Sequence, residues 1–259
     1  MIHFTKDSHI HTHYSPDADQ EATFSKYIKA AEKIGLSEIT FTDHVDFDAK
    51  HPLFYDMIDY DNYINAFNQA KKEAKIRVRL GVEIGYQSHM AKTINAFIKT
   101  YPFEFVILSI HYVEQKDLYT QEYFESKTKQ KAYQMYFDTV LDAINNIEQF
   151  DVIGHLDYIT RYSPFGDYDY PIYKKQIDYI LKALIERKKG IEINTSGLIK
   201  ENRPYPKISV IKRFIELGGQ TITLGSDSHQ ISELARGFDH INTLYNNEIK
   251  GMLFKNNSN

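Results

Sequence analysis

Residues 103–111 read Phe-Glu-Phe-Val-Ile-Leu-Ser-Ile-His, an apolar run that ends in a histidine. A nearly continuous apolar strand is typical of a parallel sheet that is covered on both faces. In a barrel of parallel strands, side chains at the carboxyl ends of the strands converge on one mouth. This stretch therefore predicts a parallel α/β fold with polar chemistry gathered at one end of the strands.

The rest of the chain alternates strand-like and helix-like segments in the same way. We predict strands at residues 7–11, 38–42, 78–84, 103–110, 152–156, 191–194 and 221–224. We predict helices at residues 22–34, 60–75, 90–100, 129–149, 174–188 and 209–217, while residues 231–249 are mixed and end helical. Seven βα units with right-handed crossovers predict a single-domain α/β protein.

Two layouts accommodate these units. A doubly wound open sheet gathers its site from two or three strands at a switch point. Ligand-type residues accompany six of the seven predicted strands. That distribution favours a closed, TIM-like (β/α)7 barrel, in which every strand can contribute to one mouth.

Composition limits the possible functions of the chain. Its 259 residues contain no apolar run near the ~20 residues of a membrane helix. The N-terminal residues have no signal-peptide pattern, so we predict a cytoplasmic protein, and we predict a frayed tail at residues 253–259. A net charge of −4 without a Lys/Arg block argues against a nucleic-acid partner. Because cysteine is absent, any metal must be held by imidazole and carboxylate groups.

Histidines and carboxylates at the strand ends form the strongest pattern. His9 and His11 are two residues apart on a strand, so both imidazoles can reach one ion. Asp227 and His229 have the same spacing. Glu83 lies inside an apolar strand, where a buried carboxylate needs a cation.

Other candidates depend on this context. Asp43 and His44 close the second strand and point opposite ways, which predicts one ligand and one orienting or proton-transfer group. Asp17 lies in a turn that can bend back over the mouth. The predicted metal ligands are His9, His11, Asp17, His44, Glu83, His111, His155, Asp227 and His229. This set exceeds the three protein ligands of a mononuclear catalytic zinc site, so we predict two or three divalent ions of zinc, manganese or iron.

The order of these motifs resembles the PHP (polymerase and histidinol phosphatase) superfamily over residues 1–259. The resemblance rests on His-x-His at 9–11, Thr-Asp-His at 42–44, Gly-Val-Glu at 81–83, Ser-Ile-His at 109–111, Gly-His at 154–155 and Gly-Ser-Asp-Ser-His at 225–229. Residues 154–157, 192–198 and 204–206 resemble the monofunctional histidinol-phosphatase branch.

The resemblance implies a distorted (β/α)7 barrel with three ions in one metal-dependent phosphoesterase domain. One ion would be held by His9, His11, Glu83 and Asp227. Glu83 would bridge to a second ion held with His111 and His155, and the third ion would be held by Asp17, His44 and His229. Many members of the superfamily have histidine at the position of Asp17.

The implied reaction is hydrolysis of L-histidinol phosphate to L-histidinol and phosphate, in histidine biosynthesis, by a metal-bound hydroxide. The leaving alkoxide needs a proton, and Asp43 together with His229 is the predicted source. Arg161 lies in the loop after a strand and is the predicted phosphate clamp, because a guanidinium grips two phosphate oxygens. Asn194, at the end of the sixth strand, is predicted to hydrogen-bond the substrate.

Several alternatives stay open at this point. The same metals can act on another small phosphomonoester or on a nucleotide, and a non-catalytic metal-binding module is a further possibility. Amidohydrolase and TatD-like barrels also open with His-x-His, but they fit the motifs at 43–44 and 227–229 poorly. A homo-oligomer is compatible with the sequence.

Overall fold

The computed structural model describes residues 5–54 and 58–244. The predicted tail at residues 253–259 and the final part of the predicted helical segment, residues 245–249, lie outside the described residues.

A parallel sheet of seven main strands forms the centre of the molecule. In spatial order these are β1 (Lys6–Ile10), β2 (Glu38–Phe41), β4 (Arg77–Gly85), β5 (Phe105–Ser109), β8 (Val152–Ile153), β9 (Gly190–Asn194) and β10 (Ile222–Gly225). Each neighbouring pair along this path is parallel. Spatial order equals chain order, as expected when every unit winds the same way round.

The two ends of this sheet meet just beyond β1 and β10. The backbone N–H of His11 donates to the carbonyl of Ser228, and that of Asp227 donates to the carbonyl of His9, both at 2.9 Å. Ile10 and Ser228 form an isolated parallel bridge. The sheet is therefore a nearly closed barrel, and the predicted (β/α)7 architecture is confirmed over the open alternative.

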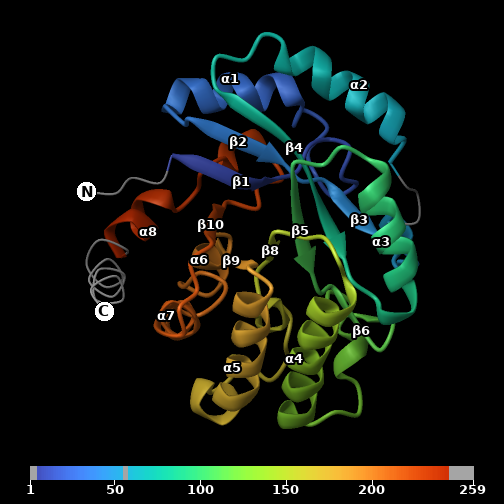
Figure 1. The fold of residues 1–259 in the computed structure, drawn as a ribbon, viewed down its shortest axis with the longest axis vertical. Coiled ribbons are helices and arrows are strands. Elements are labelled where there is room, and N and C mark those ends of the chain that lie inside the picture. The colour runs from blue at the N-terminus through green and yellow to red at the C-terminus, as the bar shows by residue number, and fades with distance from the viewer. Residues whose placement is uncertain (1–4, 55–57, 245–259) are drawn as a thin grey trace.

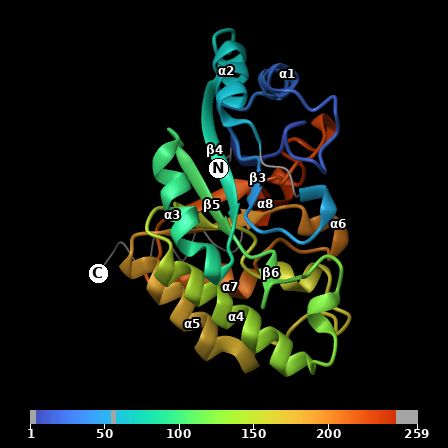
Figure 2. The ribbon, with the colours of Figure 1, turned by 90° about the vertical axis from the view of Figure 1, so that its right-hand side faces the viewer.

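Helices surround the barrel. They are α1 (Phe24–Ile34), α2 (Tyr60–Lys71), α3 (Ala91–Thr100), α4 (Lys129–Asn146), α5 (Tyr170–Glu186), α6 (Gly197–Lys200), α7 (Ile208–Glu216) and α8 (Phe238–Leu244). Figure 1 shows α1 and α2 on one side of the sheet and α4 and α5 on the opposite side. The turned view in Figure 2 places α3 and α6 on opposite flanks.

The sequence explains why α1 forms where it does. Phe24, Ile28 and Ala31 recur at helical spacing and are buried. The side chain of Thr23 caps the first turn by accepting a hydrogen bond from the backbone of Lys26. Gly35 ends the helix with a φ of 79°, a left-handed conformation that glycine adopts without strain.

Several short elements were not predicted. These are the helix α6, the strands β3 (His44–Asp46), β6 (Tyr112–Val113) and β7 (Lys116–Asp117), and the 3₁₀ turns Pro52–Phe54, Ser88–Met90, Glu122–Phe124, Tyr158–Arg161 and Ile231–Glu233. Elements of two to four residues are too short to show a hydrophobic period. Helix α5 also begins before the predicted Lys174, because proline is tolerated in the first turn of a helix.

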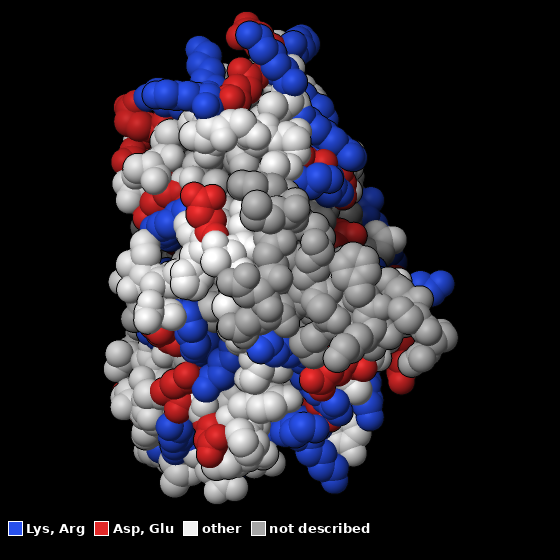
Figure 3. Space-filling model, turned by 90° about the vertical axis from the view of Figure 1, so that its left-hand side faces the viewer, with Lys and Arg blue, Asp and Glu red and all other residues white. Residues whose placement is uncertain are grey.

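Apolar side chains fill the space between the barrel and the helices. All residues of β2 and β5 are buried, which is the pattern of strands covered on both faces. Within the described residues, no helix combines the length and apolarity needed to cross a membrane. On the described part of the face in Figure 3, basic and acidic side chains are interspersed rather than separated.

Candidate metal centre

Glu83 lies at the centre of a group of histidines at the carboxyl end of the barrel. It comes from β4 and is fully buried. Its Oε2 lies 3.3 Å from Nε2 of His9 and 2.8 Å from Nδ1 of His44. Its Oε1 lies 2.9 Å from Nε2 of His155 and 3.5 Å from Nε2 of His111. Imidazoles from four other segments of the chain thus surround the carboxylate that the sequence singled out.

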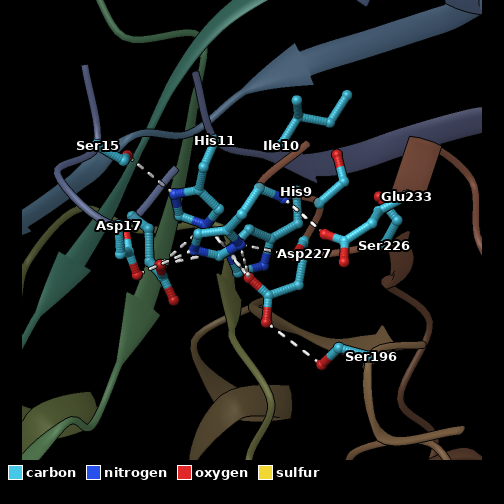
Figure 4. A network of polar contacts seen from close by, with 12 residues as sticks. His9, Ile10, His11, Ser15, Asp17, Ser196, Ser226, Asp227 and Glu233 are labelled. Atoms are coloured by element: carbon cyan, nitrogen blue, oxygen red, sulfur yellow. Dashed lines mark hydrogen bonds and ion pairs between the residues drawn. The ribbon is translucent and has the colours of Figure 1, made fainter. Parts of the chain in front are cut away.

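His9 and His11 meet Asp227 in one part of the site (Figure 4). The Nε2 atoms of the two histidines are 2.9 Å apart. Oδ1 of Asp227 lies 3.5 Å from Nε2 of His9 and 3.3 Å from Nε2 of His11. Asp227 has a φ of 54°, and this left-handed backbone is a strain typical of functional sites.

His111 and His155 form the opposite side of the site, with ring centroids 5.6 Å apart. Nδ1 of His111 lies 2.9 Å from Oδ1 of Asp46, a residue of the unpredicted strand β3. A carboxylate on the second ring nitrogen fixes the orientation and tautomer of a metal-binding histidine. Asp46 is therefore placed to orient His111.

Asp17, His44 and His229 form the outer part of the site. Oδ2 of Asp17 lies 3.2 Å from Nε2 of His229 and 3.7 Å from Nε2 of His44. The ring of His11 stacks on both histidines, at centroid distances of 4.1 and 4.2 Å. The turn after β1 thus bends back over the mouth as predicted, and the structure brings all the predicted ligands together. We call this group the ligand cluster: His9, His11, Asp17, His44, Glu83, His111, His155, Asp227 and His229.

The ligand cluster fits metal ions by geometry and by donor type. Three of its triads have ligand atoms within 4.8 Å of one another: His11, His44 and His229; His9, His11 and Glu83; and His44, Glu83 and His111. Oε2 of Glu83 and Nδ1 of His44 are close, but neither makes a hydrogen bond. Imidazole and carboxylate donors together suit zinc, manganese and iron.

Electrostatics also favour bound cations. Burial alone would lower the pKa of His9, but the nearby carboxylates of Glu192 and Glu83 outweigh it and raise that pKa well above its usual value. Burial opposes ionisation of Glu83, yet His9 and His44 hold its pKa well below the usual range. Burial and the neighbouring charges of His44 and His229 lower the pKa of His11. The carboxylates thus attract positive charge, and metal ions would replace protons on the imidazoles.

Glu192 was not among the predicted site residues. It lies on β9, and its Oε1 is 2.6 Å from Nδ1 of His9. Its Oε2 accepts a hydrogen bond from the backbone N–H of His155 at 2.8 Å. A charge inside an apolar strand was the available signal, since the same pattern had identified Glu83.

Asp43 lies behind the ligand cluster rather than in its mouth. Its buried carboxylate accepts hydrogen bonds from the backbone and hydroxyl of Thr12 at 2.6 and 2.9 Å. It also accepts from the hydroxyls of Ser15 and Tyr63, both at 2.7 Å. Ser15 Oγ is in turn 3.1 Å from Nδ1 of His11 (Figure 4). Asp43 therefore reaches the ligand cluster through Ser15, and its predicted proton transfer stays a prediction.

Arg161 lies at the edge of the ligand cluster, where its Nη1 is 3.4 Å from Oδ2 of Asp227. Its guanidinium packs over the rings of Tyr158 and Tyr162. Among the described residues, its buried Nε has no hydrogen-bond partner. Arg161 thus lies beside the ligand cluster with one guanidinium nitrogen unpaired among the described residues.

The amide of Asn194, in contrast, is engaged by its neighbours. Its Nδ2 donates to Oε2 of Glu192 at 3.2 Å, and its Oδ1 accepts from the backbone and hydroxyl of Ser196 at 3.0 and 2.6 Å. The hydroxyl of Ser196 is 3.3 Å from Oδ2 of Asp227 (Figure 4). These contacts connect Asn194 to Asp227 of the ligand cluster through Ser196. The predicted contact of Asn194 with the substrate stays a prediction.

A pocket of about 200 Å³ opens beside the ligand cluster. Several cluster residues line it, and aromatic side chains form much of the remaining wall. The lining residues are Asp17, His44, Asp46, His51, Leu53, Phe54, His111, Tyr112, Asp117, Tyr119, Tyr158 and Tyr162.

Comparisons with known proteins give a consistent result. A sequence model of the PHP domain matches residues 7–196. The histidinol-phosphatase of Lactococcus lactis subsp. lactis is 35% identical over 228 residues, which are 86% of this chain and 83% of that protein. A protein of Clostridium acetobutylicum named "probable histidinol-phosphatase" is 34% identical over 235 residues, covering 90% of this chain and 89% of its own length.

A solved structure agrees with these sequence matches. The crystal structure of histidinol phosphate phosphatase from Lactococcus lactis subsp. lactis superposes with a TM-score of 0.84 at 32% identity, covering 95% of this chain and 94% of that chain. That protein was crystallised in complex with zinc, L-histidinol and phosphate.

Proposed function

The chain belongs to the PHP domain family, and we propose that it is a metal-dependent histidinol-phosphatase. Its reaction is hydrolysis of L-histidinol phosphate to L-histidinol and phosphate, a step of histidine biosynthesis. The observation that carries this proposal is the convergence of the ligand cluster on Glu83 beside a pocket lined by cluster residues and aromatic side chains. The relatives supply the substrate, because two sequence relatives and one solved structure carry this name.

We propose that the ligand cluster holds two to three divalent ions. The first set is His9, His11, Glu83 and Asp227. The second set is Glu83, His111 and His155. The third set is Asp17, His44 and His229. Bound ions would acidify a water molecule for attack at phosphorus and neutralise charge on the phosphoryl oxygens.

Arg161 binds the phosphate group of the substrate in this proposal. Its Nε has no partner among the described residues, and the rings of Tyr158 and Tyr162 hold its guanidinium in place. Its neighbour Asp227 belongs to the first ion set, so the guanidinium lies beside the reacting phosphate. A planar fork of N–H groups can bind two phosphate oxygens at once.

In this proposal the leaving alkoxide takes its proton from His229 in the form with two ions, in which the imidazole of His229 is not a metal ligand. The side chain of His229 is 24% exposed and reaches the mouth. Asp43 is buried and already accepts four hydrogen bonds. We therefore give Asp43 a positioning role, through Ser15, on the imidazole of His11.

Steady-state kinetics on protein loaded with zinc, manganese or iron test the function. We expect L-histidinol phosphate to have a higher kcat/KM than p-nitrophenyl phosphate, glycerol phosphate and a nucleoside monophosphate. Equal use of all these substrates would favour a general PHP phosphoesterase. Absence of turnover with every metal and substrate would favour a non-catalytic metal-binding module. Four further expectations stay predictions. They are the cytoplasmic location, the homo-oligomer, the lack of a nucleic-acid partner and the single domain over residues 1–259.

A further inference from the structure

Three carboxylates line the pocket beside the ligand cluster, and Asp117 is the one that no described histidine contacts. Asp17 contacts His229, and Asp46 contacts His111. Within residues 5–54 and 58–244, Asp117 forms no ion pair, although the residue is only 8% exposed. Its Oδ1 accepts a hydrogen bond from the backbone of Tyr119 at 2.6 Å, and its Oδ2 has no hydrogen-bond partner in the same part of the chain.

The hairpin of β6 and β7 holds Asp117 in a defined place relative to the ligand cluster. The hairpin begins directly after His111, and Tyr112 pairs with Asp117 across its antiparallel strands. The backbone N–H of Leu118 then donates to the carbonyl of His111 at 3.1 Å. The carboxylate is thus connected to a predicted metal ligand by short, hydrogen-bonded backbone.

A row of three tyrosine rings runs along the pocket from His155 of the ligand cluster to Tyr119. The ring of Tyr158 lies 4.6 Å from that of His155, and the ring of Tyr162 lies 5.4 Å from that of Tyr158. The ring of Tyr119 follows at 5.3 Å from Tyr162. All three tyrosines line the pocket. One wall is therefore aromatic from the ligand cluster to Tyr119, two residues after Asp117.

A largely buried carboxylate without a cation is costly, so the pocket is suited to a ligand that brings a positive charge. We infer that Asp117 binds the ammonium group of the substrate and that Tyr119, Tyr158 and Tyr162 pack against its imidazole ring. This inference rests on the proposed function and assigns the part of the pocket that selects the substrate. L-Histidinol phosphate carries its ammonium on the carbon next to the phosphate-bearing CH₂, with the imidazole on the other side.

The test compares L-histidinol phosphate with 3-(imidazol-4-yl)propyl phosphate, which lacks only the ammonium group. Wild-type enzyme should prefer L-histidinol phosphate by roughly ten- to a hundredfold in kcat/KM, the usual effect of a hydrogen bond to a charged group. The Asp117→Asn variant keeps the shape and the acceptor for Tyr119, and it should lose most of that preference. Glu114→Gln is the matched control, because Glu114 is a half-exposed carboxylate on the same hairpin outside the pocket.

The outcomes separate this inference from the proposed function. A preference for the ammonium group that persists in a folded, metal-loaded Asp117→Asn protein would overturn the inference and leave the function intact. If that variant does not fold, the wild-type comparison decides, since equal use of the two phosphates would also overturn the inference. Wild-type enzyme that hydrolyses p-nitrophenyl phosphate as well as L-histidinol phosphate would contradict both proposals.

Discussion

Oε1 of Glu192 lies 2.6 Å from Nδ1 of His9, and its other oxygen accepts the backbone N–H of His155. One buried carboxylate on β9 therefore contacts the imidazole of His9 on β1 and the backbone of His155, two residues after β8. Partners of this kind fix the tautomer of a metal-binding imidazole and increase its basicity. In this barrel β9, which has no predicted metal ligand, thus supports ligands from β1 and from the segment after β8.

Replacing Glu192 with glutamine should weaken metal binding by about ten- to a hundredfold, the usual effect of losing such a carboxylate. Competition with a chelator measures the affinity. Glu38→Gln is the matched control, because Glu38 is a buried strand carboxylate that contacts Lys6, Arg77 and Arg79 rather than the ligand cluster. Equal metal affinity in the Glu192→Gln variant and the wild-type protein would contradict a positioning role for Glu192.

Chelation should abolish activity and lower the melting temperature. Without ions, Glu83 and Asp227 are buried carboxylates that are compensated by protonated imidazoles and, for Asp227, also by Arg161. Metal analysis combined with scanning calorimetry checks this on one sample before and after chelation. We expect more than one ion per chain, and a fully loaded protein with a single ion would refute the multinuclear site.

Arg161→Ala should reduce kcat/KM for L-histidinol phosphate by roughly ten- to a thousandfold, since a charge-assisted pair with phosphate is lost. Metal content should not change, because Arg161 is not a metal ligand in this proposal. Arg213→Ala is the control, since Arg213 forms ion pairs with Asp178 and Glu216 on the outer helices. Comparable losses in both arginine variants would show that Arg161 acts only through stability.

The Asp43→Asn variant distinguishes two roles for Asp43, that of a positioning residue and that of the general acid. As a positioning residue, Asp43 keeps Ser15 and His11 in place, so its loss should reduce kcat by about tenfold or more without moving the alkaline limb of the pH profile. Loss of that limb in Asp43→Asn would instead identify Asp43 as the acid. Asp59→Asn, which changes an exposed N-cap of α2, controls for a general effect of the substitution.

The main features of the fold were predictable from local pattern. The apolar run at residues 105–110 and its counterparts produced strands close to the predicted bounds, because hydrophobic periodicity reports burial directly. The elements that were missed, β3 and the β6–β7 hairpin, have two or three residues per strand. Both contribute pocket residues, so a part of the pocket wall has no periodic signal in the sequence.

The sequence by itself determined which side chains were available and at which strand ends they lie. It identified Glu83 as a buried charge and His9 with His11 as a pair on one face, since both conclusions depend only on near neighbours. It did not determine which atoms meet. His9 and Glu192 are 183 positions apart, and closure of the barrel alone brings them to 2.6 Å. Nor did the sequence determine that Asp117 forms no ion pair within the described residues, because the contacts of a side chain depend on every strand and loop that surrounds it.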